Sequence, residues 1–159
     1  MKKYFLGIAC LGLASIVFMA QAQQNKQAKP AKKIVYKGKT FLNDGITGNG
    51  TITKANFDAL LNKNLLSKDS NNILRPVNFF VFMYAERGLY EDSTGKLKIM
   101  TDNYSLQCDN GKLPEDWIKN IRQRSKAGDT AYFNNIRASF DSIGKYHFYS
   151  EPLKLIITD

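Results

Sequence analysis

Residues 78–86, NFFVFMYAE, decide the fold, because positions 79 to 85 form an unbroken apolar run rich in aromatic side chains. A run this short is typical of a strand that is buried on both faces. Pro76 stands just ahead of it, and a proline suits the entrance of a strand better than a central ladder position. The stretch therefore predicts a central strand, around which the other elements are expected to assemble.

Five further stretches predict strands, because they carry β-branched and aromatic side chains or alternate between polar and apolar ones. They are residues 33–42, 96–101, 104–108, 131–139 and 153–158. In KLKIMT, the first alternating stretch, we expect Leu97 and Ile99 to face the core, and in LKLIIT the odd-numbered positions should do the same. Residues 67–72 between the expected elements are predicted to form a loop.

Two short helices are predicted from apolar side chains at helical spacing. Thr53 is the expected N-cap of the first helix, and Pro114 fits the first turn of the second, which should end near Gly128. The apolar faces comprise Phe57, Leu60, Leu61 and Leu65 in the first helix and Leu113, Trp117, Ile118 and Ile121 in the second. Together with the strands, they predict a mainly β fold, an Ig-like β-sandwich with two short helical insertions.

Residues 1–22 have the parts of a secretory signal peptide. Lys2 and Lys3 supply the positive start, residues 4–20 are apolar or small, and residues 20–22, AQA, fit the cleavage pattern. We therefore expect a periplasmic or secreted protein. The alternative is an uncleaved signal anchor, because an apolar run of this length is at the lower limit of about 17–25 residues for a membrane-spanning helix.

The positive charge lies ahead of the expected folded domain, residues 34–159. The chain of 159 residues has a net charge of +9, yet residues 41–159 contain almost equal numbers of basic and acidic side chains. Residues 23–33, QQNKQAKPAKK, carry no aromatic or β-branched side chain and are predicted to form a basic flexible linker. The alternative is that these lysines contact an anionic membrane surface or an acidic partner. A nearly neutral domain argues against a nucleic-acid partner.

Residue chemistry gives no indication of an enzyme, a metal site or a cofactor. His147 is the single histidine, so a site built from several histidines is excluded. The glycines at 45, 48 and 50 lack the following Lys-Ser/Thr of a phosphate-binding loop, and no serine has the flanking glycines of a nucleophile elbow. Cys108 is the single cysteine after the expected cleavage site; we expect a small buried side chain, with an intermolecular disulfide as the alternative.

Two stretches resemble the C-terminal domain of the GldM/PorM family, which belongs to the gliding-motility and type IX secretion motor. They are residues 48–61, GNGTITKANFDALL, and residues 126–138, KAGDTAYFNNIRA. The first resembles that domain's opening before a helix, and the second its Gly-Asp-x-Val-Tyr-Phe segment, which follows a helix and begins a strand. The resemblance covers roughly residues 34–159.

This resemblance implies an Ig-like β-sandwich in the periplasm that acts by binding protein, as the end of a shaft that reaches an outer-membrane-associated ring. Two departures stand out. The family's motor protein begins with a membrane helix that carries an ionisable residue, whereas this chain has no acidic residue before Asp44. The family's Gly-Pro-Asp-Gly loop is replaced after Ala138 by SFDSIG and then KYHFY, so we expect an altered contact surface.

The sequence thus predicts a non-enzymatic protein-interaction domain with a protein partner in the periplasm or at the outer membrane; a homodimer is also compatible with it. Aromatic side chains are enriched at interface hot spots, so Tyr146, His147, Phe148 and Tyr149 are the predicted partner contacts. The alternative for these four residues is packing in the core or in a strand. The alternative function is a carbohydrate-binding module that uses Trp117 as a stacking platform, which an exposed Trp117 beside a groove would favour.

Overall fold

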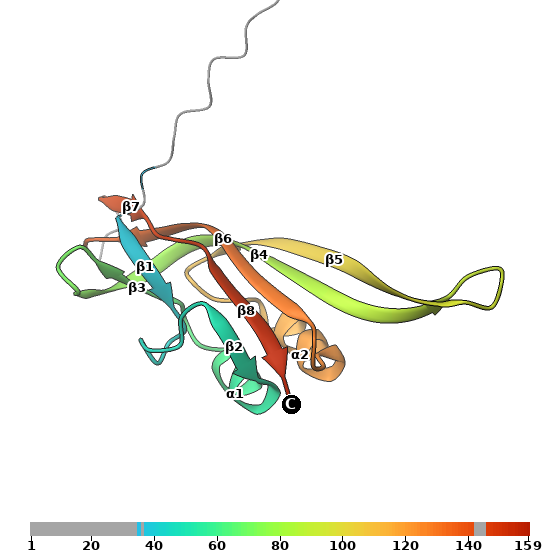
Figure 1. Ribbon diagram of the computed structural model, residues 1–159. Coiled ribbons are helices and arrows are strands. Elements are labelled where there is room, and N and C mark those ends of the chain that lie inside the picture. Colours follow the sequence, from blue (N-terminus) through green and yellow to red (C-terminus); the bar gives the residue numbers. More distant parts are fainter. Residues whose placement is uncertain (1–34, 36, 142–145) are drawn as a thin grey trace, which may run out of the picture. The chain divides into compact units, whose positions relative to one another are not determined.

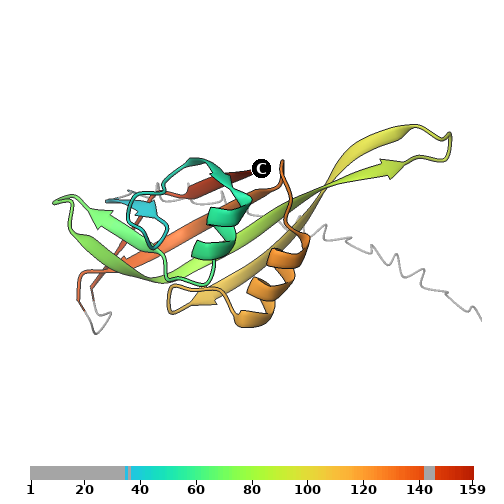
Figure 2. The same ribbon diagram turned by 90° about the horizontal axis from the view of Figure 1, so that it is seen from below.

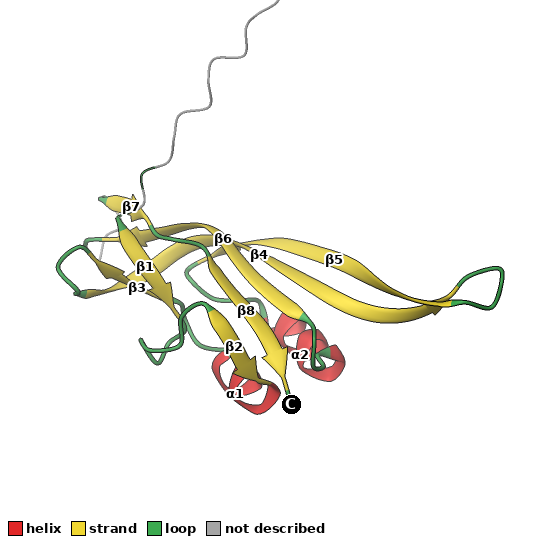
Figure 3. Ribbon diagram, in the orientation of Figure 1, coloured by secondary structure: helices red, strands yellow, loops and turns green. Residues whose placement is uncertain are grey.

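The computed structural model describes residues 35, 37–141 and 146–159 (Figures 1 and 3). The predicted signal peptide, residues 1–22, and the linker, residues 23–33, lie outside the described residues. The elements follow one another as β1 (Gly38–Phe41), β2 (Gly50–Thr53), α1 (Lys54–Leu60), β3 (Leu66–Asp69), β4 (Leu74–Glu91), β5 (Leu97–Asp109), α2 (Glu115–Arg124), β6 (Thr130–Ser139), β7 (His147–Tyr149) and β8 (Leu153–Thr158). The prediction of a mainly β fold with two short helices is confirmed.

All eight strands belong to one sheet, in the order β1-β3-β4-β6-β8-β2, with β5 beside β4 and β7 beside β6. Every pairing is antiparallel except that of β2 with β8, which is parallel. The sheet is curled, and both helices lie against the same face of it (Figures 1 and 2). The Ig-like β-sandwich is not confirmed, since the described strands are joined along one hydrogen-bonded path.

Strand β4 is the centre of the sheet, as its sequence predicts, but it is not buried on both faces. Phe80, Phe82 and Tyr84 are at most 2% exposed and point to the helices, whereas the residues between them are half-buried. The helices cover only one face, which explains the difference. Pro76 lies within β4, opposite Leu66 of β3, and the pairing with β6 begins one residue later.

The core lies between the sheet and the two helices. The ring of Phe82 contacts Phe133 at 5.1 Å between centroids and meets Trp117 edge-on at 6.2 Å. Phe57 on α1 is fully buried, and the Thr53 hydroxyl caps that helix by accepting the Asn56 N–H, as predicted. The odd-numbered residues of β8 are buried, also as predicted.

Cys108 is buried in β5 and free, which fits the prediction of a small buried side chain. Burial raises the pKa of its thiol to about 11. A buried, protonated thiol is a poor partner for an intermolecular disulfide, because the thiolate is the reactive form.

Three boundary predictions were wrong. Residues 67–72 are not all loop, because β3 lies there between β1 and β4, with the buried hydroxyl of Ser67 bonded to Ser150 (2.8 Å). The stretches 96–101 and 104–108 form the single strand β5. Helix α2 ends at Arg124, and Gly128 instead forms the turn into β6, with φ of +93°.

Leu97 and Ile99, predicted to face the core, are 62% and 63% exposed. The pairing of β4 with β6 ends at Ala85 and Thr130, so the outer part of the β4–β5 hairpin projects beyond its neighbours (Figure 1). Alternation correctly predicts a strand here, but no described element covers either of its faces.

Candidate functional site

Of the four predicted contact residues, the structure exposes three. Phe148 is 3% exposed, packs against Phe140 at 4.6 Å between ring centroids and lies opposite Ala138 of β6, so it is part of the core. Tyr146, at 62%, and Tyr149, at 39%, are exposed, as is His147. The short strand β7 therefore combines one core residue, Phe148, with two surface residues, and the exposed Tyr146 lies just ahead of it.

The helix-free side of the sheet, which we call the open face, carries a band of half-buried or exposed apolar side chains. Strand register places them together, since residues directly opposite each other share a face. The band comprises Phe79, Val81, Met83, Tyr132 and Ile156 on the central strands and Leu89, Leu97 and Ile99 on the hairpin.

Two cations lie over aromatic rings of the open face. The Arg137 guanidinium lies 4.1 Å from the centroid of Phe79, and the Lys154 ammonium lies 5.6 Å from that of Tyr132. Tyr149 is opposite Arg137 in the pairing of β6 with β7, which brings β7 to the same face. His147 also reaches this region, because it lines a shallow depression together with Phe79 and Arg137. The open face is thus apolar and aromatic, with the cations of Arg137 and Lys154 over its rings and the carboxylate of Asp109 in the same depression.

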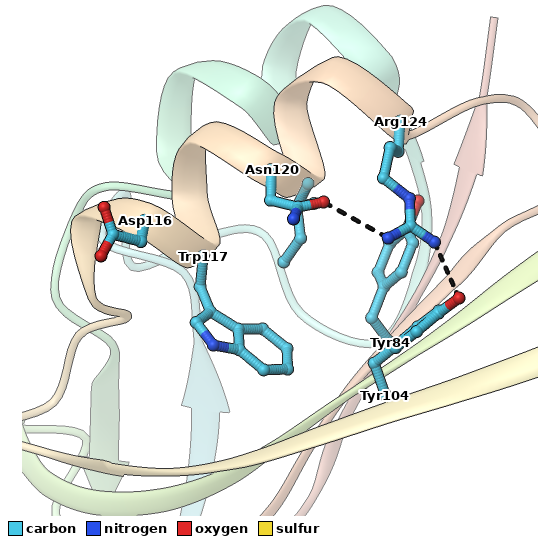
Figure 4. Close-up of a pocket in the computed structure, with 7 residues that line it drawn as sticks. Tyr84, Tyr104, Asp116, Trp117, Asn120 and Arg124 are labelled. Carbon is cyan, nitrogen blue, oxygen red and sulfur yellow. Dashed lines mark hydrogen bonds between the residues drawn. The ribbon is translucent and has the colours of Figure 1, made fainter.

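A groove lies on the opposite side, between α2 and the strands β4 and β5 (Figure 4). Its volume is about 200 Å³, and its lining comprises Tyr84, Tyr104, Asp116, Trp117, Asn120, Ile121 and Arg124. Trp117 is half-buried, with one edge packed against Phe82. It is therefore neither the exposed platform that would favour a carbohydrate site nor fully buried.

Polar groups at one end of the groove already bond to each other. The Arg124 guanidinium donates to the Tyr104 hydroxyl at 2.8 Å and forms an ion pair with Glu86. These two contacts raise the pKa of Arg124 above its usual value. At the other end, Asp116 makes no ion pair with any residue that the structure describes. The groove therefore has one neutralised end and one end with an uncompensated negative charge.

The Gly-Asp motif of residues 128–129 is a structural junction. The carboxylate of Asp129 is fully buried and accepts three hydrogen bonds: from the Tyr84 hydroxyl at 2.6 Å, the Arg87 N–H at 2.8 Å and the Lys126 N–H at 3.1 Å. Burial and the bond to Asp129 raise the pKa of the Tyr84 hydroxyl far above its usual value. Asp129 thus holds β4 to the turn between α2 and β6.

The other motif, residues 48–61, also forms a junction. The Lys54 ammonium contacts the Asp58 carboxylate at 2.8 Å, and it reaches across to the Arg122 carbonyl at 3.0 Å and the Ser125 hydroxyl at 2.7 Å. Arg122 in turn donates to the Asp58 carbonyl. Both stretches that carry the family resemblance therefore connect helices and strands, and the second also supplies Tyr132 and Arg137 to the open face.

Sequence reasoning missed most of these surface residues. Phe79, Val81 and Met83 belong to the run that predicted burial on both faces, and Arg124 is not among the predicted contact residues. Alternate residues of the apolar run lie on opposite faces of the strand, so its two sets of side chains could be told apart from the sequence. The sequence does not show, however, that one of the two faces is left uncovered.

Neither described helix is long and apolar enough to cross a membrane. Within residues 35, 37–141 and 146–159, no three histidine, cysteine or carboxylate side chains are grouped as a metal site would require. A scan against models of protein families finds no match to the chain, and a search of the curated proteins finds none either.

Proposed function

We propose that this protein is a non-enzymatic, periplasmic protein-interaction domain related to the terminal domain of the GldM/PorM family. The single observation that carries the proposal is the open face with its projecting hairpin, where Leu89, Leu97 and Ile99 are each more than 60% exposed. Contiguous exposed apolar side chains on a folded domain mark interaction surfaces. The cations over Phe79 and Tyr132 add a preference for a partner with acidic side chains around an apolar centre.

Kinship with the GldM/PorM terminal domain, including its Ig-like character, is part of the proposal. It is supported by the places that the two similar stretches take in the chain. Residues 48–61 run from β2 into α1, and residues 126–138 follow α2 and begin β6, the same local order as in the family. The apolar run of residues 4–20 supports the periplasmic location.

The test compares capture of periplasmic proteins by the wild-type chain and by two surface variants. Leu89→Ser combined with Ile99→Ser should abolish capture of specific partners, identified by mass spectrometry, without lowering the melting temperature. The matched control is Ile46→Ser, which removes an equally exposed apolar side chain, 81% accessible, from a loop outside the open face. Equal capture by all three chains would exclude the open face as the binding surface.

A second experiment concerns β7. Tyr146→Ala combined with Tyr149→Ala should weaken capture of the same partner, because Tyr149 borders the open face. A large fall in the melting temperature would instead assign these side chains to the core.

The second candidate function is carbohydrate binding in the groove, where polar side chains, those of Asn120 and Asp116, lie beside the accessible part of the Trp117 ring. Apolar sugar faces stack on aromatic rings, and their hydroxyls need planar polar partners. Titration calorimetry with soluble oligosaccharides tests this candidate. Heat of binding that is lost in Trp117→Ala, at unchanged stability, would establish it, and the absence of binding at millimolar sugar would exclude it.

A further inference from the structure

The outer edge of β5 is a long, regular strand edge without a partner in the part of the chain that the structure describes. All 13 residues of β5 pair with β4, from Leu97 opposite Glu91 to Asp109 opposite Phe79, without a bulge. No described element other than β4 pairs with it. At about 3.4 Å per residue, the edge is about 40 Å long.

Folded proteins usually protect such an edge with prolines, bulges or inward-pointing charges. Strand β5 has no proline and no bulge, and Lys98 is its one basic residue. An edge like this is suited to pair with another strand, and strand addition uses main-chain hydrogen bonds for affinity and side-chain pockets for specificity.

We propose that β5 pairs antiparallel with β5 of a second copy of this chain, around a two-fold axis at Asn103. Asn103 is the central residue of the strand. The axis therefore lays the projecting half of one β5, residues 97–102, along the body half of the other, residues 104–109. The same surface serves both copies, as a two-fold dimer requires. This inference is independent of the proposed function, because it concerns the sheet edge and the groove rather than the open face.

The even-numbered side chains of β5 carry the specificity, because they lie on the groove side of the sheet. The register shows this: Cys108, Leu106 and Tyr104 oppose the buried, helix-facing residues of β4. In the proposed register, Met100 of one copy opposes Leu106 of the other, whose partner on β4, Phe82, contacts the Trp117 ring. Met100 is 53% exposed in the single chain. A methionine thioether contacts aromatic rings favourably, so this pairing fills the groove.

Charges also match along the groove. In the same register, Lys98 opposes Cys108 of the second copy, near the end of β5 from which the chain turns into the first residues of α2. Asp116 lies in that first turn, at the end of the groove away from Arg124 (Figure 4). Lys98 is anchored in its own chain only by an exposed ion pair with Asp92, and Asp116 has no ion pair among the described residues. The two Asp102 carboxylates flank the axis, each beside a Tyr104 that bonds to Arg124, so a cation lies near this like-charged pair.

The proposal accounts for the projection of the hairpin. Among the described elements of a single chain, the outer half of β5 pairs with β4 alone, whereas in the dimer it completes the edge of the other sheet. Standard protein interfaces bury about 800 Å² per partner, and two edges of this length with the grooves beside them offer an extended surface for such a contact. A second copy is therefore the occupant that both the length of the edge and its side chains fit.

Disulfide trapping of the purified full chain tests the register. Asn103→Cys places two thiols opposite each other at the axis, so mild oxidation should give a covalent dimer in more than about half of the chains. Met100→Cys is the matched control and should stay largely uncrosslinked, because Met100 opposes Leu106. Efficient crosslinking of Met100→Cys instead, or of neither variant, would overturn the proposed register.

Sedimentation equilibrium tests the contacts. Met100→Lys should weaken dimerisation at least about tenfold, because it puts a charge into an apolar groove. The control Leu89→Lys, on β4 and on the open face, should leave it unchanged. Lys98→Glu and Asp116→Lys should each weaken the dimer about tenfold, and the double variant should recover most of the loss. A monomer at all concentrations up to about 0.5 mM, or no recovery in the double variant, would overturn the proposal.

Discussion

The two halves of strand β4 have the same pairing partner in β5 and the same alternation, yet they lie in opposite environments. In the inner half, residues 77–85, β6 pairs along the other edge and the helices cover one face, so Phe80 and Phe82 are almost completely buried. In the outer half, residues 86–91, β5 is the one described neighbour, and Leu89 is 65% exposed.

An apolar side chain in a strand is therefore evidence that the strand forms, but not that another element of the fold covers that side chain. The hydrogen bonds of β4 and β5 continue without interruption into the hairpin, whereas the packing stops where β6 and the helices stop. A side chain in the inner half should therefore contribute more to the free energy of unfolding than a similar side chain in the outer half.

The largest difference in the free energy of unfolding between the inner and outer halves should come from variants of the core side chains. Phe82→Ala should lower the free energy of unfolding by about 3–5 kcal/mol, because it leaves a cavity among Phe133, Tyr84 and Trp117. Ile99→Ala in the hairpin should change it by less than about 0.5 kcal/mol. Urea denaturation followed by tryptophan fluorescence measures both, and a large effect of Ile99→Ala would mean that the hairpin is covered.

The next largest difference in the free energy of unfolding should come from the buried carboxylate of Asp129, which is bonded to the inner half of β4. Asp129→Ala leaves the Tyr84 hydroxyl and two backbone N–H groups without their acceptor, which should cost about 3 kcal/mol of stability. In the hairpin, Asp102 also accepts a tyrosine hydroxyl, that of Tyr90, but at the surface. Asp102→Ala should cost less than about 0.5 kcal/mol. Similar losses in the two variants would show that burial does not determine the strength of these bonds.

Alanine substitution of turn glycines in the two regions should give a smaller difference in stability than the core and carboxylate variants do. A Cβ on Gly111, whose φ is +71°, would lie 2.0 Å from the carbonyl oxygen of Val77, so Gly111→Ala should cost about 2–3 kcal/mol. Gly95 at the hairpin turn has φ of +80°, but a Cβ there would make only an ordinary contact, 3.6 Å from Glu91 Oε1, and Gly95→Ala should cost about 1 kcal/mol. Thermal unfolding provides the comparison, and an equal loss at both glycines would contradict the overlap with Val77.

The smallest effect on stability should come from lowering the pH, and it should be confined to two turns. Asp69 accepts the N–H groups of Asn71 and Ile73 at the β3–β4 turn, and Asp92 accepts those of Thr94 and Lys96 at the β4–β5 turn. Desolvation opposes the shift at Asp69, but bonds from Arg75 and the backbone prevail and lower its pKa; the bond from Lys98 is the main cause of the lowered pKa of Asp92.

Because both carboxyl groups have a lower pKa in the folded chain, their contribution to stability is complete above about pH 4 and is lost as the pH falls through the lowered values. Amide chemical shifts between pH 2 and 6 should follow both turns. Asp92→Asn should remove the acid dependence at the hairpin turn alone. A hairpin that remains acid-sensitive in this variant would assign the effect to another group.

Several features could be predicted from the sequence because they depend on neighbours along the chain. Thr53 caps α1, Phe57 and Leu61 face the core, and the apolar run lies in the central strand, as local patterns indicate, although that strand begins earlier than predicted, at Leu74. The candidate surfaces could not be predicted in this way. The groove combines Trp117 from α2 with Tyr104 from β5, and the open face combines residues of β4, β6 and β8.

The sequence by itself determined the class of the fold, the two short helices, the central strand and the concentration of positive charge ahead of the folded domain. These follow from periodicity, capping and composition, which act over a few residues. Only the tertiary structure decided that the strands form one curled sheet, that helices cover one face of it, and that half of the β4–β5 hairpin is left uncovered. Exposure of a strand depends on which elements lie beside and above it, and those elements come from distant parts of the chain.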